Sequence, residues 1–336
     1  MILDSLMIEM LPKIEDTLKD MVYKKIPQQY TGIVEMMSYH MGWTNSIEKQ
    51  KGKRIRPIIL LLSTKICGGE WQKALPAAAA VELLHNFSLI HDDIEDQSEF
   101  RHGRNTVWKL WGLSQAINTG DAMFSLSQLG ILDLGNLVNI EVAYESIKVF
   151  NLTCVSLTGG QYLDMTFEND KEISSDNYFQ MVSGKTAALL AASTEIGAIV
   201  AQTTIANRKH LHTFGEALGL AFQAQDDYLG IWGEEPLTGK SRSSDLKSGK
   251  KTLPVVFAFE KMPELKEKFC KKPINDDEID ERAMILENLG AKKYTESVTK
   301  HYTNLAIQSL NAVEISDKKA YQALLELTNF LLTRNK

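Results

Sequence analysis

The stretch AAAAVELLHNFSLIHDDIEDQS, residues 77–98, carries the clearest structural signal in the chain. It runs without an internal glycine or proline, and Pro76 stands just before it, where a helix can begin. Apolar residues lead directly into the acidic run at its end. We therefore expect a core helix whose last turn presents Asp92, Asp93 and Asp96.

Helical periodicity extends from this stretch in both directions. We expect helices near residues 1–24, 31–47, 115–134, 138–158, 176–206 and 208–229, a polar loop at 233–251, a hydrophilic joint at 271–280 and two amphipathic segments at the C-terminus. Only eight prolines and 21 glycines occur among the 336 residues, which favours helices over turn-rich β architecture. No linker divides the pattern, so the sequence predicts one all-α domain over residues 1–336, a large helical bundle.

The composition excludes several classes of protein. The chain has 37 Lys and Arg residues against 43 Asp and Glu residues, a net charge of −6, which argues against a nucleic-acid partner. Cys67, Cys154 and Cys270 lie too far apart for a zinc motif or a disulfide framework, so we expect a reducing, cytoplasmic compartment. The N-terminus lacks a signal peptide pattern. Polar residues interrupt the apolar run at 187–206, so we expect no transmembrane segment.

Two acidic clusters close apolar helices. Asp92 and Asp96 are four residues apart and share one helical face, where like charges repel unless something compensates them. Asp226 and Asp227 follow a second apolar helix. Oxygen ligands suit Mg²⁺, which also takes ligands from substrate phosphates, so two such half-sites would fit a bound diphosphate. A solvated helix end is the alternative for either cluster alone.

A third acidic cluster repeats the spacing of the first. Asp276, Asp277 and Asp280 follow a basic, hydrophilic segment instead of an apolar helix. Acidic residues stabilise the first turn of any helix through its dipole. We therefore expect an exposed helix start here and no metal site.

Several cationic residues could bind phosphate. Lys53, Arg54 and Arg56 lie within GKRIRP (52–57), Arg101 and Arg104 follow the first acidic cluster, and Lys185, Lys240 and Lys250 lie further along the chain. Arginine offers bidentate phosphate recognition and lysine a compact charge. The chain has no glycine-rich phosphate loop, which disfavours nucleotide enzymes.

Taken together, these motifs resemble the trans-isoprenyl diphosphate synthases, the polyprenyl synthetase family. The resemblance covers nearly the whole chain and rests on GKRIRP, LLHNFSLIHDDIED, GQYLD (160–164), GKTAALLAAS, FQAQDDYLGIWG and TGKSRSSDLKSGKKTLP, in that order. It implies a Mg²⁺-dependent enzyme that condenses isopentenyl diphosphate with an allylic diphosphate (dimethylallyl, geranyl or farnesyl) in a central cavity. It also implies a homodimer, which is the commonest symmetric assembly.

The resemblance further implies roles for individual residues. Asp92, Asp96 and Asp226, supported by Asp93 and Asp227, would hold three Mg²⁺ and the allylic diphosphate. Arg101, Lys185 and Lys240, with Lys250 nearby, would neutralise that diphosphate as it leaves. Lys53, Arg56 and His85 would bind isopentenyl diphosphate, and Thr186 and Gln223 would stabilise the allylic cation.

The chain departs from the family pattern at two positions. His102 stands where a second arginine usually serves isopentenyl diphosphate, so binding there should weaken or vary with pH. Gly230 stands where the second motif often ends in aspartate. Because Asp226 carries most of the metal binding in the family, we expect this loss to be tolerated.

Product length depends on the residues upstream of Asp92. Phe87 and Ser88 lie five and four residues before it, and an aromatic residue at the fifth position is similar to archaeal geranylgeranyl diphosphate synthases. We therefore expect a C20 product. Leu84 or a neighbouring helix could form the floor instead, with C15 farnesyl diphosphate as the next product.

Two other functions remain open at this stage. A class I terpene cyclase shares an acidic metal motif but does not bind isopentenyl diphosphate, for which Lys53, Arg56 and His85 are present. A non-catalytic subunit of a prenyl synthase would have lost acidic ligands, whereas both clusters keep their leading pair.

Overall fold

The structure is a computed structural model that describes residues 1–44, 52–169, 172–233, 244–271 and 273–332. Helices dominate these residues, and the strands among them are the short antiparallel pair β1 (Phe100–Arg101) and β2 (Arg104–Asn105). The predicted all-α class is confirmed. Residue contacts divide the chain into two compact units, and the expectation of a single domain stays a prediction.

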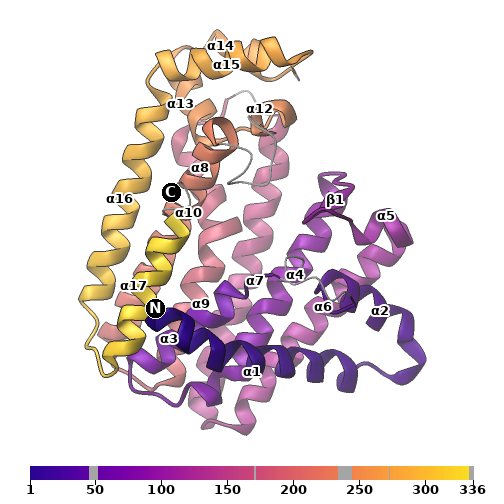
Figure 1. The fold of residues 1–336 in the computed structure, drawn as a ribbon, viewed down its shortest axis with the longest axis vertical. Coiled ribbons are helices and arrows are strands. Elements are labelled where there is room, and N and C mark those ends of the chain that lie inside the picture. The colour runs from indigo at the N-terminus through magenta and orange to yellow at the C-terminus, as the bar shows by residue number, and fades with distance from the viewer. Residues whose placement is uncertain (45–51, 170–171, 234–243, 272, 333–336) are drawn as a thin grey trace. The chain divides into compact units, whose positions relative to one another are not determined.

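The first unit comprises residues 1–151, 193–208 and 314–324. Its complete helices are α1 (Ile2–Lys25), α2 (Thr31–His40), α3 (Ile55–Ile66), α4 (Leu75–Glu95), α5 (Val107–Trp111) and α6 (Leu113–Asp133) (Figure 1). Helix α4 packs against α1, α3 and α6, and most extensively against α6.

Helix α4 is the centre of this unit because its first half is apolar on nearly every side. The alanines of residues 77–80 are fully buried, as are Val81, Leu83 and Leu84, and a helix that is apolar all round belongs in a core. Pro76 occupies its first turn, as predicted. Gly120 of α6 permits a close approach, since a Cβ there would lie 2.2 Å from Nε2 of His91.

A buried arginine joins three helices of the first unit. Arg54 precedes α3 with a left-handed backbone (φ 51°). Its guanidinium donates to Glu15 of α1 at 2.6 Å, to Glu82 of α4 at 3.0 Å and to the carbonyl of Met41 at 3.1 Å. Burial disfavours its charge, yet Glu82 and Glu15 raise the pKa of the guanidinium. Arg54 thus stabilises the fold, whereas its neighbours Lys53 and Arg56 have other surroundings.

The second unit comprises residues 152–192, 209–313 and 325–336. Its complete helices are α8 (Ser175–Val182), α12 (Ser244–Ser248), α13 (Leu253–Lys261), α14 (Leu265–Phe269), α15 (Asp276–Asn288) and α16 (Ala291–Asn311). Helix α13 packs against α8, α14, α15 and α16. Four helices contribute residues to both units: α7 (Ile140–Asn169), α9 (Ala188–Val200), α10 (Ile205–Trp232) and α17 (Lys318–Leu332).

Local structure differs from the sequence prediction at several places, among them α7, which runs to Asn169, and α15, which begins within the expected joint at 271–280. The helix expected over 176–206 is divided by a π-helical turn at Ser183–Ala187. Part of the polar segment predicted as a loop forms α12. The helix expected over 31–47 ends at His40, and residues 45–47 lie outside the described residues. No described helix combines the length and apolar character needed to cross a membrane.

Candidate active site

The first acidic cluster lies at the end of α4 in the first unit. Asp92 and Asp96 are both half-buried, and the backbone N–H of Asp96 donates to the carbonyl of Asp92 at 2.8 Å. Their carboxylates are hard oxygen ligands one helical turn apart. The helix therefore ends in the paired arrangement that the sequence predicted.

Asp93 differs from its two neighbours. Its side chain is buried and accepts hydrogen bonds from Nε of Arg101 at 2.9 and 3.0 Å and from Nη2 at 2.8 Å. Burial raises the pKa of the Asp93 carboxyl although Arg101 opposes that shift. Asp93 is predicted to support the metal ligands, and its hydrogen bonds also orient Arg101.

The short hairpin β1–β2 follows this cluster. His102 and Gly103 form its two-residue turn with φ angles of 51° and 73°, and Arg101 pairs with Arg104 across it. Two successive positive φ angles are typical of a type I′ hairpin turn. His102 is exposed, and partial burial of the ring together with Arg101 and Arg104 lowers its pKa. The imidazole is therefore uncharged near neutral pH.

Arg56 and His85 meet inside the first unit. Nη1 of Arg56 lies 3.1 Å from Nε2 of His85. Burial, followed by Arg56 and Arg101, lowers the pKa of His85 well below its ordinary value. His85 is thus a neutral partner, and Arg56 keeps its positive charge available for an anion. Lys53, the third residue of this predicted set, is exposed.

The second acidic cluster, at the end of α10, belongs to the second unit. Asp226 is half-buried, whereas Asp227 is buried. Asp227 accepts from the Tyr178 hydroxyl at 2.6 Å, from the backbone N–H of Leu253 at 2.8 Å and from Nε2 of Gln223 at 2.8 Å. Burial raises the pKa of Asp227 to about 7. Asp227, predicted as a metal ligand, therefore links α8, α10 and α13.

Gln223 is oriented by this link. Its Nε2 donates to Asp227, and its Oε1 accepts from the Thr186 hydroxyl at 2.9 Å. The two residues predicted to stabilise a cation are thus in direct contact. Their oxygen dipoles are held in place before any substrate binds, which is the condition for electrostatic stabilisation.

The π-helical turn carries Lys185 and Thr186. Such turns are rare and often lie at functional sites. Gly160 of α7 makes room for this one, since a Cβ there would lie 2.1 Å from the backbone nitrogen of Lys185. Nζ of Lys185 then reaches Oδ2 of Asp164 on α7 at 2.5 Å.

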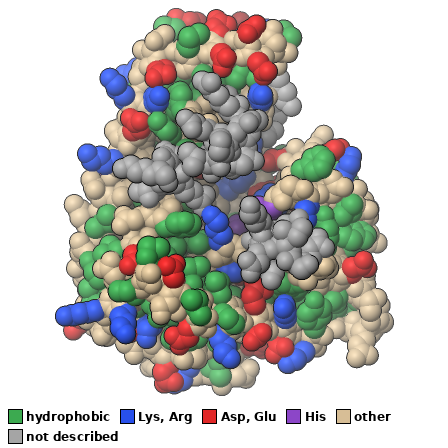
Figure 2. Space-filling model, in the orientation of Figure 1, with side chains coloured by type: hydrophobic (Ala, Val, Ile, Leu, Met, Phe, Trp, Pro, Cys, Tyr) green, Lys and Arg blue, Asp and Glu red, His purple; other side chains and the backbone are tan. Residues whose placement is uncertain are grey.

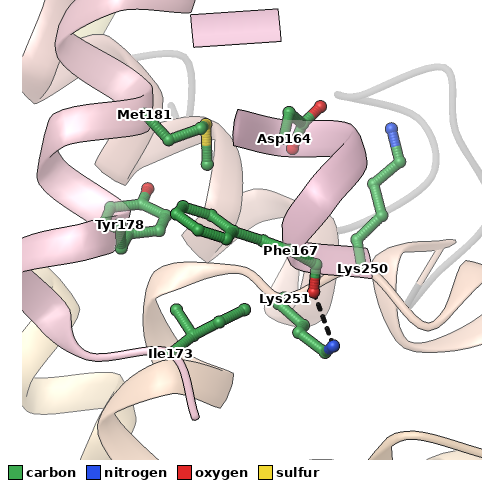
Figure 3. Close-up of a pocket in the computed structure, with 7 residues that line it drawn as sticks. All are labelled: Asp164, Phe167, Ile173, Tyr178, Met181, Lys250 and Lys251. Atoms are coloured by element: carbon green, nitrogen blue, oxygen red, sulfur yellow. Dashed lines mark hydrogen bonds between the residues drawn. The ribbon is translucent and has the colours of Figure 1, made fainter. Parts of the chain in front are cut away.

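A pocket in the second unit lies beside these residues. Its lining residues are Asp164, Phe167, Ile173, Tyr178, Met181, Lys250 and Lys251. Figure 3 shows Lys250 extending beside Asp164, while Lys251 turns away to donate to the carbonyl of Phe167 at 2.6 Å. The predicted phosphate-binding residue Lys250 is thus at a pocket wall. Lys240, predicted for the same task, lies outside the described residues.

The third acidic cluster starts α15 on the surface. Asp276, Asp277 and Asp280 are exposed, and Asn275 caps the helix by accepting from the N–H of Glu278 at 2.9 Å. Figure 2 shows acidic side chains gathered where α15 lies. The structure thus shows the exposed helix start that the sequence predicts for this cluster.

The acidic residues of the two clusters supply only part of the ligand shell that a magnesium ion needs. Within the described ranges, no group of three or more His, Cys, Asp or Glu side chains could hold a metal ion. Asp92, Asp96 and Asp226 supply the correct oxygen chemistry, and Mg²⁺ ordinarily completes its octahedral shell with water and substrate phosphate. Each cluster by itself is therefore compatible with ions that bind together with a diphosphate.

The three residues expected to set product length have different surroundings. Phe87 is half-buried, with its ring 5.2 Å from Phe124 of α6 and 4.7 Å from His91. Leu84 is fully buried, and the Ser88 hydroxyl donates to the His85 carbonyl at 2.8 Å. Phe87 and Phe124 together form the bulky part of this face.

Sequence reasoning assigns no role to three residues of these surroundings, Asp164, Tyr178 and His40. Asp164 had a sequence signal, since it ends the GQYLD motif. Tyr178 and His40 had none, because only folding brings them to Asp227 and to the hairpin arginines.

Comparison with known proteins defines the class. The family model described as polyprenyl synthetase matches residues 39–287. A geranylgeranyl diphosphate synthase from Sulfolobus acidocaldarius is 34% identical, covering 98% of this chain and 97% of that protein. A (2E,6E)-farnesyl diphosphate synthase from Mycobacterium tuberculosis is 35% identical, covering 89% of this chain and 85% of that protein.

A solved structure shows the same fold. The geranylgeranyl pyrophosphate synthetase from Pyrococcus horikoshii superposes with a TM-score of 0.90 at 30% identity, covering 99% of this chain and 98% of that one. The helical fold and the acidic helix ends are thus those of a prenyltransferase. The chain belongs to the polyprenyl synthetase family.

Proposed function

We propose that this protein condenses isopentenyl diphosphate with an allylic diphosphate and that its main product is geranylgeranyl diphosphate (C20). The observation that carries the proposal lies within the first unit. The half-buried pair Asp92 and Asp96 ends the same helix that presents His85 to Arg56. Ligands for a metal-bound diphosphate and a cationic site for a second anion thus share one helix.

Asp92, Asp96 and Asp226 are the proposed magnesium ligands. Magnesium ions, three per active site by family resemblance, would supply positive charge that stabilises the departing diphosphate. Arg101, oriented by Asp93, adds a guanidinium, and Lys185, Lys240 and Lys250 add ammonium groups. Such positive charges favour ionisation because they stabilise charge that develops in the transition state.

Thr186 and Gln223 are the proposed stabilisers of the allylic cation. When the carbon–oxygen bond breaks, the electron pair leaves with the diphosphate, and the cation faces oxygen dipoles oriented through Asp227. The double bond of isopentenyl diphosphate, held by Lys53, Arg56 and His85, then forms the new carbon–carbon bond. A proton is lost last, with the departing diphosphate as the base.

The C20 product is preferred over C15 because of Phe87. Its ring packs on Phe124 at 5.2 Å, five residues before Asp92, and the two rings would close a channel along α4 at intermediate depth. Farnesyl diphosphate is the alternative product, favoured by the likeness to the mycobacterial farnesyl diphosphate synthase. A terpene cyclase is disfavoured by the Arg56–His85 pair, which such an enzyme does not need.

A cytoplasmic homodimer is the proposed working form. All three cysteines are free thiols, as a reducing compartment favours. Leu152, Val155 and Tyr162 of α7 are large, apolar and exposed, at spacings of three and seven residues. Such a stripe on one helical face suits burial against a second copy.

A product assay tests the proposal. Purified protein is incubated with labelled isopentenyl diphosphate, each allylic diphosphate in turn, and Mg²⁺ or EDTA, and the dephosphorylated products are sized by chromatography. The proposal predicts Mg²⁺-dependent C20 chains. Products that stop at C15 would favour the farnesyl alternative, and cyclised products without incorporated isopentenyl diphosphate would indicate a cyclase.

A further inference from the structure

The hairpin of the first unit places two arginines directly opposite each other. Arg101 and Arg104 are paired in antiparallel register, so their side chains leave the same face. Like charges at such a pair are destabilising unless other groups compensate them. Arg101 is compensated by Asp93. In the described part of the chain, Nε and Nη1 of Arg104 are buried and have no hydrogen-bond acceptor.

Arg104 is nevertheless held in a defined place. Its Cζ lies 4.6 Å from the ring centroid of Tyr39, a cation–π contact. The Tyr39 hydroxyl donates to the carbonyl of Asn105 at 2.8 Å, and its ring makes an edge contact with Trp111 at 5.1 Å. The aromatic platform is thus tied to the strand that carries Arg104. Buried donors fixed without an acceptor cost free energy unless a ligand supplies one.

Neutral imidazoles accompany the hairpin arginines, and Asp93 is the acidic partner of Arg101. His40 lies near both hairpin arginines, and burial followed by Arg101 and Arg104 lowers its pKa to about 3, so its ring is uncharged. Arg56 adds a further buried Nε that lacks an acceptor among the described residues. Two arginines with unsatisfied donors, accompanied by neutral imidazoles, make a site that favours an anion with several oxygens.

We propose that Arg104 binds the diphosphate of isopentenyl diphosphate through Nε and Nη1, so that it replaces the guanidinium absent at position 102. The identity of the anion rests on the proposed function. His102 is poorly placed for this task, because it is exposed at the tip of the turn. Arg104 is therefore a specificity-determining residue for the second substrate.

Direct binding tests the assignment without turnover. Isopentenyl diphosphate is titrated calorimetrically into the full-length protein without metal or allylic substrate, for the wild type, Arg104→Met and the control Arg208→Met. Arg208 is also a partly buried arginine of the first unit, but it is paired with Glu145. Arg104→Met should raise the Kd about tenfold to hundredfold, the effect of a lost charge-assisted contact. Arg208→Met should change it less than about twofold.

A second variant covers the case in which Arg104→Met does not fold, as judged by circular dichroism. Arg104→Lys keeps a charge over Tyr39 but loses the guanidinium fork, so its Kd should lie between those of the wild type and Arg104→Met. An unchanged Kd in the folded Arg104 variants, or an equal loss in Arg208→Met, would overturn the proposal.

Steady-state kinetics add a second readout. Arg104→Lys should raise the KM for isopentenyl diphosphate and leave the KM for the allylic substrate unchanged, whereas equal rises in both would overturn the assignment. If the wild-type protein makes no prenyl product, that result contradicts only the proposed function. The titration would still decide the role of Arg104.

Discussion

Aspartates at different positions in this chain share one sequence pattern but lie in different surroundings. Asp92 and Asp226 lie half-buried at the ends of core helices, whereas Asp276 and Asp280 are exposed on the first turns of α15. The pattern of paired aspartates therefore predicts metal binding only where an apolar helix precedes it.

We expect Asp92→Ala and Asp226→Ala to lower kcat at least about a hundredfold, since each removes a group that stabilises charge in the transition state. Asp276→Ala and Asp280→Ala are the matched controls and should stay within about twofold of the wild type, as surface changes do. Initial rates at saturating Mg²⁺ measure this. Comparable losses at all four positions would contradict the distinction.

Asp227 makes folding stability depend on pH. Its pKa in the folded protein is about 7, and in an unfolded chain it is about 3.9. The folded state thus binds the proton more tightly, so the contribution of Asp227 to stability is present below about pH 4 and is lost as pH rises toward about 7.

We therefore expect metal-free wild type to lose stability relative to Asp227→Asn as pH rises from about 4 to about 7, by a few kcal/mol in all. Urea unfolding at several pH values measures the difference. In Asp227→Asn the side-chain amide of Gln223 should also flip, because Asn offers a donor where Gln223 now donates. We therefore expect kcat to fall in this variant. A pH-independent difference would show that Asp227 does not titrate in this range.

At the scale of elements, the contact between α7 and the π-helical turn depends on Gly160. A Cβ at this position would lie 2.1 Å from the backbone nitrogen of Lys185 and 2.6 Å from the backbone carbon of Gly184. Backbone atoms cannot rotate away as a side chain can. The two segments must therefore separate if a side chain is added.

Gly160→Ala should destabilise the protein by about 1–3 kcal/mol or more, the usual cost of overpacking, and should reduce activity because Lys185 is displaced. Gly32→Ala is the control: it lies in α2, and a Cβ there meets nothing within 4 Å. It should change stability by less than about 1 kcal/mol, in the stabilising direction. Thermal unfolding of both variants gives the comparison, and equal melting temperatures would contradict the close contact.

Helix α4 is also the element on which we expect product length to depend. Phe87→Ala removes a ring that packs on Phe124, and a longer prenyl tail could occupy the space. We expect products longer than C20 from Phe87→Ala and also from Phe124→Ala, sized by chromatography after dephosphorylation. A C20 distribution that is unchanged in both variants would place the floor elsewhere, with Leu84 as the next candidate.

At the scale of the whole molecule, the exposed stripe of α7 predicts how copies associate. Val155 is 72% exposed between Leu152 and Tyr162. Val155→Glu would place an unpaired charge in the proposed interface, so we expect light scattering to report a monomer in place of a dimer. Ile8→Glu, which changes an equally exposed residue of α1, should remain dimeric. A dimer in both variants would exclude this face.

The sequence alone determined the class of the protein and indicated the candidate residues for its chemistry. Spacing within a helix is local, so the shared face of Asp92 and Asp96, the buried character of α4 and the exposed start of α15 follow from neighbouring residues. The order of the motifs then indicated the family that the comparisons confirmed.

Tertiary structure decided which groups surround each member of these motifs. Asp93 and Asp227 have the same local pattern as Asp92 and Asp226, yet Arg101, Tyr178 and the N–H of Leu253 occupy their oxygens. Arg54 and Arg56 are two residues apart, and only Arg54 is bound by carboxylates, those of Glu15 and Glu82. These partners come from distant segments, and no local spacing encodes the burial and long-range hydrogen bonds that assign each charge its role.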